Sequence, residues 1–266
     1  SYYRNSNLNW EETKTLIEKT TNNKSTVVTQ GFIGCDSNGH TTTLGREGSD
    51  YTASIFAFIL NAESVTIWKD VLGVLNADPR YFERTQLLKK ISYREAIELA
   101  YYGASVIHPK TLQPLQRKGI PLFVKSFENP KMGGTKVSKG SKLTPFIPCF
   151  IIKKNQILIQ LSTLDFSFIV EENISEIFSL MDEYKMRVEM IQNSAITFAI
   201  CVNDKYNKLK ELILALNVKF KVKVKENVSL HTIRHFDNSS IKEIKESGKK
   251  ILLEQRTSET AQFILA

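Results

Sequence analysis

The sequence predicts a mixed α/β protein, with a mostly parallel sheet covered by helices on both faces over residues 1–146 and smaller βαββαβ units over residues 147–266. In the first part, short apolar strands alternate with helical segments, which is typical of a parallel sheet with helices on both faces. In the second part, the segments are shorter and are separated by Asn, Asp and Ser. The pattern changes at Gly140–Pro148, where we place the boundary.

The first part opens with a helix predicted at Asn9–Thr20, because Asn9 is a good N-cap and two glutamates follow in the first turn, near the positive end of the helix dipole. The other elements are expected from hydrophobic period and turn residues. In chain order they are a strand at Ser25–Phe32, a hairpin turn at Asp36–Gly39, a Gly-rich loop at Thr42–Asp50, a helix at Tyr51–Asn61, a strand at Val65–Trp68, a helix at Ser92–Tyr102 and a strand at Pro121–Ser126.

The second part contains one complete βαββαβ unit. Its elements are expected at Ile157–Leu161, Asn173–Tyr184, Arg187–Ile191, Ile196–Val202, Lys208–Leu216 and Phe220–Val224. The remaining elements give only β-α-β-β, at Val228–Arg234, Ile241–Ser247, Lys250–Gln255 and Gln262–Leu265. We expect the early strand Pro148–Lys153 to complete this second unit, which would thread the first unit through the second.

The composition is that of a folded globular protein, since 42% of the 266 residues are hydrophobic and 24% are charged. No run of about 18 apolar residues occurs, so we expect no membrane partner. The polar start Ser1–Asn7 lacks the apolar region of a secretory signal. Cys35, Cys149 and Cys201 are far apart, which argues against a metal site or a disulfide framework and suits a reducing cytoplasm.

The formal net charge of +8 raises the question of a polyanionic partner. Part of the excess comes from Lys219, Lys221, Lys223 and Lys225, which alternate with apolar residues. That spacing is typical of a strand with one buried and one solvated face. The stretch has no interleaved exposed aromatic residues, so we expect no nucleic-acid partner.

Three stretches carry residues suited to chemistry, and the first is Thr41-Thr-Thr-Leu-Gly-Arg-Glu-Gly-Ser-Asp-Tyr-Thr-Ala53. A glycine loop at a helix N-terminus presents backbone N–H groups to an anion. Arg46 adds a fork suited to a carboxylate or a phosphate. The alternative is a plain turn in which Ser49 or Asp50 caps the helix that follows.

The second stretch, Trp68-Lys-Asp-Val-Leu-Gly-Val-Leu-Asn-Ala-Asp-Pro-Arg80, follows a predicted strand directly. Ligands of open α/β sheets bind beyond the carboxyl ends of strands, so this loop is in a suitable place. Asp70 could orient a metal-bound or ribose group, and Lys69 and Arg80 could hold phosphates. The alternative is that Asp78-Pro-Arg80 is simply a turn.

The third stretch is Ala100-Tyr-Tyr-Gly-Ala-Ser-Val-Ile-His-Pro-Lys110. Its His108 precedes a proline, and the sequence implies no partner carboxylate nearby. We therefore interpret His108 as a structural hydrogen-bonding residue rather than as a catalytic base.

These three stretches, in this order and at this spacing, resemble the aspartokinases of the amino-acid kinase superfamily. The match is strong from about Thr29 to Gly134 and continues weakly to the end, where the family carries two intertwined ACT regulatory domains with a ferredoxin-like fold. The resemblance implies that ATP, with its Mg²⁺, phosphorylates the β-carboxylate of L-aspartate to 4-phospho-L-aspartate. That reaction is the entry step to lysine, threonine and methionine biosynthesis.

The resemblance also implies roles for single residues. Arg46 and Ser49 match positions that hold the substrate aspartate. The positions that match nucleotide contacts are Lys69, Asp70, Arg80 and Val106.

The chain also departs from the family pattern near these residues. Glu47 replaces a frequent Gly, Lys69 a frequent Thr and Ser105 a frequent Lys. One interpretation is that Lys69 supplies the charge that Ser105 lacks.

The largest departure is a loop that is absent. Aspartokinases begin with a strand and a Lys-Phe-Gly-Gly loop, whose lysine stabilises the transferring phosphoryl group, and this sequence has no such loop. Lys131-Met-Gly-Gly134 is similar in letters but matches a different turn of the family. Phosphoryl transfer depends chiefly on positioned positive charge. We therefore assign no catalytic residue and expect the chain to be an inactive C-terminal fragment of an aspartokinase.

In the ACT-like part, Phe166, Val188 and Ser194 match effector-pocket positions of lysine-sensitive relatives, and Glu189 takes a pocket position where those relatives have Asp. Ala195 stands where those relatives have Glu, which predicts a weaker response to lysine than an acidic pocket would give. The expected partners are an amino-acid effector, lysine or threonine, and a second copy of the chain through the ACT domains. One alternative is that this stretch is only a dimer interface, and another is that the whole chain is a non-catalytic amino-acid sensor.

Overall fold

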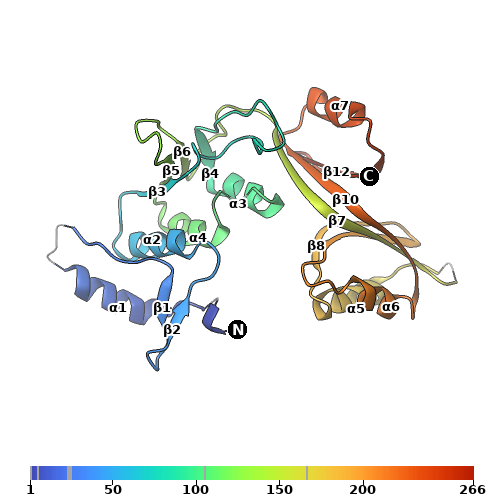
Figure 1. Cartoon of the computed structure of the whole chain (residues 1–266), viewed down its shortest axis with the longest axis horizontal. Helices are drawn as coiled ribbons and strands as arrows, with labels where there is room; N and C mark the ends of the chain where they lie inside the picture. Colours follow the sequence, from blue (N-terminus) through green and yellow to red (C-terminus); the bar gives the residue numbers. More distant parts are fainter. Residues whose placement is uncertain (1, 5, 23–25, 105, 166) are drawn as a thin grey trace. The chain divides into compact units, whose positions relative to one another are not determined.

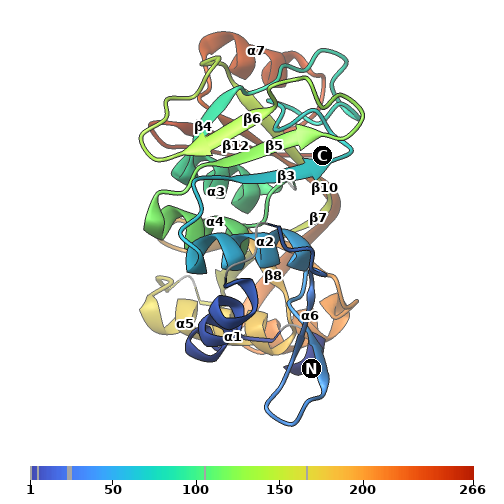
Figure 2. The ribbon, with the colours of Figure 1, turned by 90° about the vertical axis from the view of Figure 1, so that its left-hand side faces the viewer.

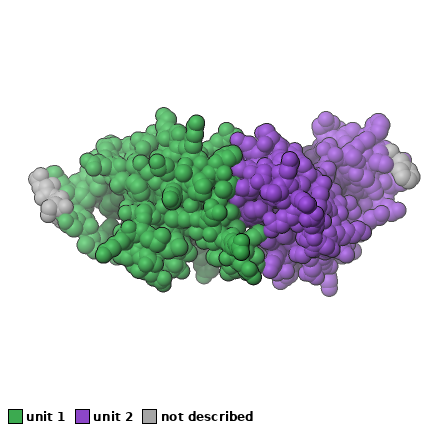
Figure 3. Space-filling view, turned by 90° about the horizontal axis from the view of Figure 1, so that it is seen from above, with its two compact units in different colours: residues 1–147 green, residues 148–266 purple. Residues whose placement is uncertain are grey.

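The computed structural model describes residues 2–4, 6–22, 26–104, 106–165 and 167–266. The chain forms two compact units, residues 1–147 and residues 148–266, which Figure 3 shows in different colours. Ser105 and Phe166, named in the sequence analysis, lie outside the described residues. Each unit is considered on its own below.

The first unit is built on a four-stranded sheet of order β3-β5-β6-β4. Its strands are β3 (Val65–Lys69), β5 (Leu122–Ser126), β6 (Thr135–Ser138) and β4 (Lys90–Ser92). β3 and β5 are parallel, as are β4 and β6, whereas β5 and β6 are antiparallel. The mixed α/β class predicted from the sequence is therefore confirmed.

Three helices pack on this sheet in the described residues: α2 (Gly48–Ile59), α3 (Tyr93–Tyr102) and α4 (Pro109–Lys118). Figures 1 and 2 show them on one face of the sheet, so the helices expected on both faces are not found in the described residues. Ser92 caps α3 by accepting a hydrogen bond from the Glu95 N–H. The sequence analysis did not predict α4, which contains Pro114 although proline is normally excluded from helix interiors.

The helices and strands enclose a core of aliphatic side chains. Seven of them are completely buried: Leu88, Ile91, Leu112, Leu115, Leu122, Val124 and Val137. Burial of apolar area on this scale is the main force that holds such a unit together.

The N-terminal region contains the short helix η1 (Tyr2–Arg4), α1 (Trp10–Thr21) and a hairpin of β1 (Ile33–Cys35) and β2 (Thr41–Thr43). Asn9 caps α1 as predicted, since its side chain accepts a hydrogen bond from the Glu12 N–H. The hairpin turn was also predicted, and the Asp36 carboxylate accepts hydrogen bonds from backbone N–H groups within it.

The strand predicted at Ser25–Phe32 is wrong. Its described residues, 26–32, form no strand, and Val28 is 94% exposed. An apolar run becomes a strand only where another strand supplies a ladder of hydrogen bonds, and the described segment pairs with no strand. Of its described residues, only the last, Phe32, is held, by the Leu44 N–H and the Thr52 hydroxyl.

The second unit is one six-stranded antiparallel sheet of order β11-β12-β10-β7-β9-β8. The strands are β7 (Cys149–Thr163), β8 (Arg187–Asn193), β9 (Thr197–Asn203), β10 (Phe220–Arg234), β11 (Ile251–Arg256) and β12 (Thr260–Leu265). The helices are α5 (Glu171–Glu183), α6 (Leu209–Leu216) and α7 (Asn238–Glu246). β7 and β10 are each 15 residues long and lie side by side in Figure 1.

The register of β7 and β10 shows the pairing that was expected of the early strand. The first half of β7 pairs with the second half of β10, from Cys149 opposite Arg234 to Lys153 opposite Leu230. The later half of β7 pairs with the start of β10 on one side and with β9 on the other. Each half of the sheet thus takes a part of both long strands.

Alternating side chains on these strands reach opposite faces of the sheet. Ile157, Ile159 and Leu161 join the core under α5 and α6, whereas Leu158 belongs to a cluster on the other face with Cys201. Burial raises the pKa of the Cys201 thiol to about 12, so this cysteine is an apolar filler, as expected. The lysines Lys221, Lys223 and Lys225 of β10 are exposed, in agreement with the predicted solvated face.

A pH-dependent stability is expected from His231 on β10. This ring is 9% exposed, and burial, with the nearby cations Lys249 and Lys154, lowers its pKa from 6.5 to about 4. The unfolded chain takes up the proton first as the pH falls. The stabilisation by neutral His231 is therefore complete above pH 6.5 and is lost between pH 6.5 and 4, by up to about 3 kcal/mol.

Urea unfolding at pH 7 and at pH 4.5 measures this effect. His231→Leu is expected to make stability fall less between pH 7 and pH 4.5. His40→Gln, at a 64% exposed ring that pairs only with the partly exposed Asp36, should change this pH dependence much less. An acid dependence that is identical in the chain and in His231→Leu would contradict the assignment.

Gly134, between β5 and β6, is expected to tolerate no side chain. Its φ is +67°, and a Cβ there would lie 2.0 Å from the carbonyl oxygen of Val124. Gly140 has a φ of +70° but open space around it, so Gly140→Ala serves as the control for backbone strain alone. Gly134→Ala should lower the free energy of unfolding by at least about 2 kcal/mol more than Gly140→Ala. Equal losses in denaturant titrations would refute the close approach.

Candidate functional site

The carboxyl ends of β3 and β5 lie next to each other in the first unit. The two strands are parallel, with Lys69 opposite Ser126, and the Phe127 N–H donates a 2.9 Å hydrogen bond to the Lys69 carbonyl. The loop that begins at Asp70 and the loop that begins at Phe127 therefore leave the same edge of the sheet. In open α/β sheets this edge is where ligands bind.

The N-terminal turn of α2 contains the first predicted stretch. Gly45 and Glu47 both adopt positive φ, at +81° and +53°, and Gly48 opens the helix. A side chain at Gly48 would bring a Cβ within 2.5 Å of the Phe32 ring, so the turn needs glycine there. Arg46 and Ser49 are exposed, which leaves both side chains accessible to a ligand.

Lys69 connects this turn to the end of β3. Its Nζ lies 2.9 Å from Asp50 Oδ2 and 4.0 Å from Glu47 Oε2. All three side chains are mostly buried, with exposures of 20% for Lys69, 13% for Asp50 and 17% for Glu47. The structure thus joins Lys69 to carboxylates of α2.

Arg80 is held by Asp78 in the loop that follows β3. The Arg80 guanidinium donates to both Asp78 oxygens, at 3.0 Å from Nε and 2.6 Å from Nη2. This hydrogen bonding lowers the pKa of Asp78 below its usual value. The Arg80 side chain is 76% exposed and Asp70 is also exposed, so both can meet a solvent-borne ligand.

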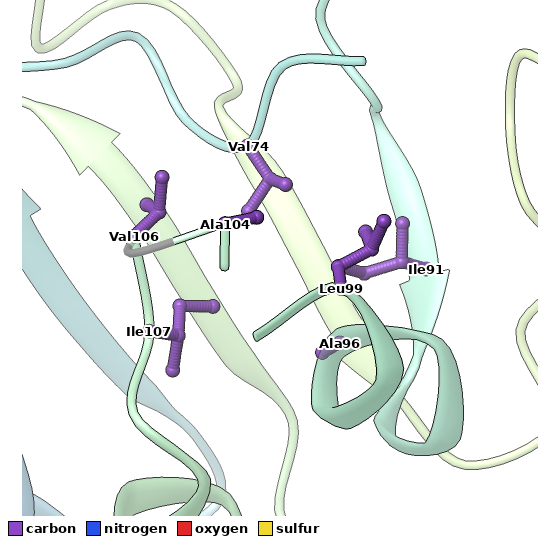
Figure 4. Close-up of a pocket in the computed structure, with 7 residues that line it drawn as sticks. All are labelled: Val74, Ile91, Ala96, Leu99, Ala104, Val106 and Ile107. Atoms are coloured by element: carbon purple, nitrogen blue, oxygen red, sulfur yellow. The ribbon is translucent and has the colours of Figure 1, made fainter. Parts of the chain in front are cut away.

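Val106 lines a small apolar pocket between α3, β4 and the segment before α4. The pocket, shown in Figure 4, is lined by Val74, Ile91, Ala96, Leu99, Ala104, Val106 and Ile107. Its volume of about 10 Å³ is close to the minimum that holds one water molecule. A nucleotide base does not fit inside it, so any contact by Val106 would be made at the surface.

His108 is the N-cap of α4. Its Nδ1 accepts a 3.1 Å hydrogen bond from the Lys110 N–H, with Pro109 at the first helical position. Burial lowers the pKa of His108, which keeps the ring neutral and able to accept. The predicted structural role agrees with this geometry.

In the second unit, each described residue predicted to line an effector pocket has contacts of its own. Val188 packs against the core under α5 and α6. The Glu189 side chain is 6% exposed and forms ion pairs with Lys153 and, at 3.0 Å, with Arg187. Ser194 lies in the turn between β8 and β9, where its Oγ is 2.6 Å from Thr197 Oγ1.

The sequence analysis missed the ionic partners at both places. It named Lys69 but assigned no role to its contacts with Glu47 and Asp50, and it did not name Lys153. One usable signal was present, since Glu47 and Lys69, although far apart in the chain, are both departures from the family pattern and carry opposite charges. The described part of the chain contains no group of three or more His, Cys, Asp or Glu residues that could hold a metal ion. Nor does it contain a helix long and apolar enough to cross a membrane.

Comparison with known proteins gives related sequences and structures. Residues 4–126 match the model of the amino acid kinase family. Lysine-sensitive aspartokinase 3 of Escherichia coli K12 is 35% identical over 215 residues, which are 78% of this chain and 48% of that protein. The chain thus spans about half the length of this curated relative.

Solved structures give the same relationship. E. coli aspartokinase III in complex with aspartate and ADP has a TM-score of 0.78 at 29% identity, covering 99% of this chain and 63% of that one. E. coli aspartokinase III in complex with lysine and aspartate has a TM-score of 0.77 at 29% identity, covering 98% and 62%. Residues 4–126 are therefore similar to the amino acid kinase family, and the relatives and solved structures that the chain resembles are aspartokinases.

Proposed function

We propose that the protein containing this chain is an aspartate kinase, which transfers the γ-phosphoryl group of ATP to the β-carboxylate of L-aspartate and forms 4-phospho-L-aspartate. This is the first step of lysine, threonine and methionine biosynthesis. The observation that carries the proposal is an ion pair in the first unit. Lys69, the last residue of β3, pairs with Asp50 in the turn that carries Arg46 and Ser49, and Asp70 follows Lys69 directly. Support also comes from the aspartate and ADP named with the E. coli structure.

Aspartate is proposed to bind at the N-terminal turn of α2. The exposed guanidinium of Arg46 can form a two-pronged, charge-assisted contact with a substrate carboxylate. Ser49, in the first helical turn, can donate a hydroxyl hydrogen bond, and the positive end of the α2 dipole favours an anion there. These contacts would hold the β-carboxylate oxygen for attack on the γ-phosphorus.

ATP is proposed to bind across the loop that follows β3. Asp70 stands at the strand end, Arg80 is oriented by its contact with Asp78, and Val106 contributes backbone or surface contact. Mg²⁺ binds such sites through one or two carboxylates together with nucleotide phosphates and water, and the exposed Asp70 fits that need. The ion would therefore arrive with the nucleotide and neutralise phosphate charge.

The domain assignment follows from the same proposal. Residues 1–146 form the nucleotide-side portion of an amino acid kinase domain, and residues 147–266 form two intertwined ACT domains. The support for the second assignment is topological, because the strand order β10-β7-β9-β8 gives the 4-1-3-2 arrangement of a βαββαβ sheet. The order β7-β10-β12-β11 gives the same arrangement when β7, which comes first in the chain, takes the place of the fourth strand. ATP use and free thiols suit a cytoplasmic enzyme.

An amino-acid effector, lysine or threonine, is proposed to bind the second unit near Phe166, Val188, Glu189 and Ser194, at an interface between two copies of the chain. The edge strand β8 is open to pairing in the described residues. Leu164, Phe168 and Val170 precede α5 and are exposed by 65%, 70% and 44%, respectively, which suits burial by a partner. A non-catalytic amino-acid sensor is the alternative function, and it predicts no nucleotide binding.

The Arg46 contact predicts a selective loss of aspartate use. In the full-length protein, Arg46→Ala removes a charge-assisted hydrogen bond and should lower kcat/KM for aspartate roughly 10- to 150-fold, while KM for ATP changes by less than about twofold. Steady-state kinetics with each substrate varied separately measure both constants. Arg117→Ala, at the far end of α4, is the matched control. An unchanged aspartate dependence would remove Arg46 from the site.

The proposed effector interface predicts a ligand-stabilised dimer. Light scattering should give a dimer at tens of micromolar, and an effector that binds only the dimer should raise the melting temperature as its concentration rises. Lysine, threonine and methionine are compared in one thermal-shift series, with a weak response to lysine expected because Ala195 provides no carboxylate. A monomer that none of the three ligands stabilises would disprove this part of the proposal.

A further inference from the structure

Lys69 occupies a position from which it could serve either the nucleotide or the substrate turn. It is the last residue of β3, at the carboxyl edge of the sheet, and a lysine there could point at phosphates. Its Nζ instead lies 2.9 Å from Asp50 and 4.0 Å from Glu47, both on the N-terminal turn of α2. The contacts therefore favour the substrate turn.

The charges of this cluster make Lys69 hard to replace. Two carboxylates share one ammonium, and Glu47 Oε2 and Asp50 Oδ2 are both buried and accept no hydrogen bond from the described residues. The 2.9 Å contact of Asp50 is thus an ion pair by distance without hydrogen-bond alignment. A buried carboxylate that loses its counter-charge becomes strongly unfavourable.

The backbone of the same turn contains a residue in an unfavourable conformation. Glu47 adopts a φ of +53°, a left-handed conformation that is unfavourable for a residue with a side chain, and it lies directly between Arg46 and Gly48. Such a conformation persists only where surrounding contacts impose it, and the Lys69 ammonium is a contact that reaches the Glu47 side chain. Loss of that ammonium should loosen the turn that carries Arg46 and Ser49.

We propose that Lys69 is a positioning residue for the aspartate-binding turn, acting through Asp50 and Glu47 to fix Arg46 and Ser49. The proposal rests on the proposed function where it refers to aspartate. The alternative is that Lys69 contacts nucleotide phosphates directly.

The first test measures the turn itself and needs no catalysis. Limited trypsin digestion of the 266-residue chain, followed by mass spectrometry, gives the rate of cleavage after Arg46. Lys69→Met should raise this rate at least ~5-fold, because a loosened turn opens more often. Lys69→Arg, which keeps the charge, should stay near the original rate.

The control is Lys125→Met, on the neighbouring strand β5 and opposite Trp68 in the register. It removes a lysine close to Lys69 in the sheet but without a described ion pair at the turn, so its cleavage rate should not change. Asp50→Asn keeps the shape of the side chain and should reproduce the effect of Lys69→Met even if the latter folds poorly. Unchanged cleavage in Asp50→Asn and in Lys69→Met would overturn the proposal.

The second test separates substrate positioning from phosphate contact in the full-length protein. Lys69→Met should raise KM for aspartate about tenfold and leave KM for ATP within about twofold. A raised KM for ATP with an unchanged KM for aspartate would overturn the proposal in favour of a phosphate contact. If the unaltered protein does not phosphorylate aspartate, the proposed function fails, and the proteolysis result still decides whether Lys69 fixes the turn.

Discussion

The pairing of β7 with β10 is the contact on which the whole second unit depends. The two strands run antiparallel from Phe220 opposite Thr163 to Arg234 opposite Cys149. β9 and β12 add to their outer edges, and β8 and β11 add in turn to those strands. Each half of the sheet therefore borrows a segment from the same central pair, so neither half can form its complete sheet alone.

At the proposed site of the first unit, two segments are held together by an ion pair rather than by shared strands. The core of this unit is aliphatic, but the turn before α2 and the end of β3 are joined by charge, through Lys69 and Asp50 at 2.9 Å. An apolar contact at this edge would need a dry surface, which a ligand-binding edge does not offer. A partly buried ion pair tolerates nearby water and polar ligands while it keeps the two segments in register.

The sequence predicted the parts of the fold whose pattern is local or complete. The alternation of Phe220, Val222 and Val224 with lysines is a strand signal that needs no knowledge of the partner strand, and the count of elements revealed that one βαββαβ unit lacked a strand. β4 and β6 could not be found in this way, because strands of three and four residues exist only through their pairing. The predicted strand at Ser25–Phe32 failed for the corresponding reason, since apolar residues alone do not supply a partner.

In the candidate site too, the residues within motifs were predicted from the sequence and the contacts between distant residues were not. Arg46, Ser49, Asp70 and Arg80 were named from motifs, which are contiguous in the sequence. The carboxylate partners of Lys69 and the contact of Glu189 with Lys153 join residues far apart in the chain, so no motif contains them. Only the folded backbone brings these charges together.

The shared long strands impose an order on assembly during synthesis. Residues 149–153 emerge from the ribosome early, yet their strand partners in the second half of β10 come after the whole of α5, β8, β9 and α6. The first βαββαβ unit can close as soon as the start of β10 is available, whereas the leading end of β7, which β9 does not reach, has no strand partner until residues 230–234 are made. Chaperone binding and mistaken strand exchange between nascent copies are therefore most favoured at this waiting segment.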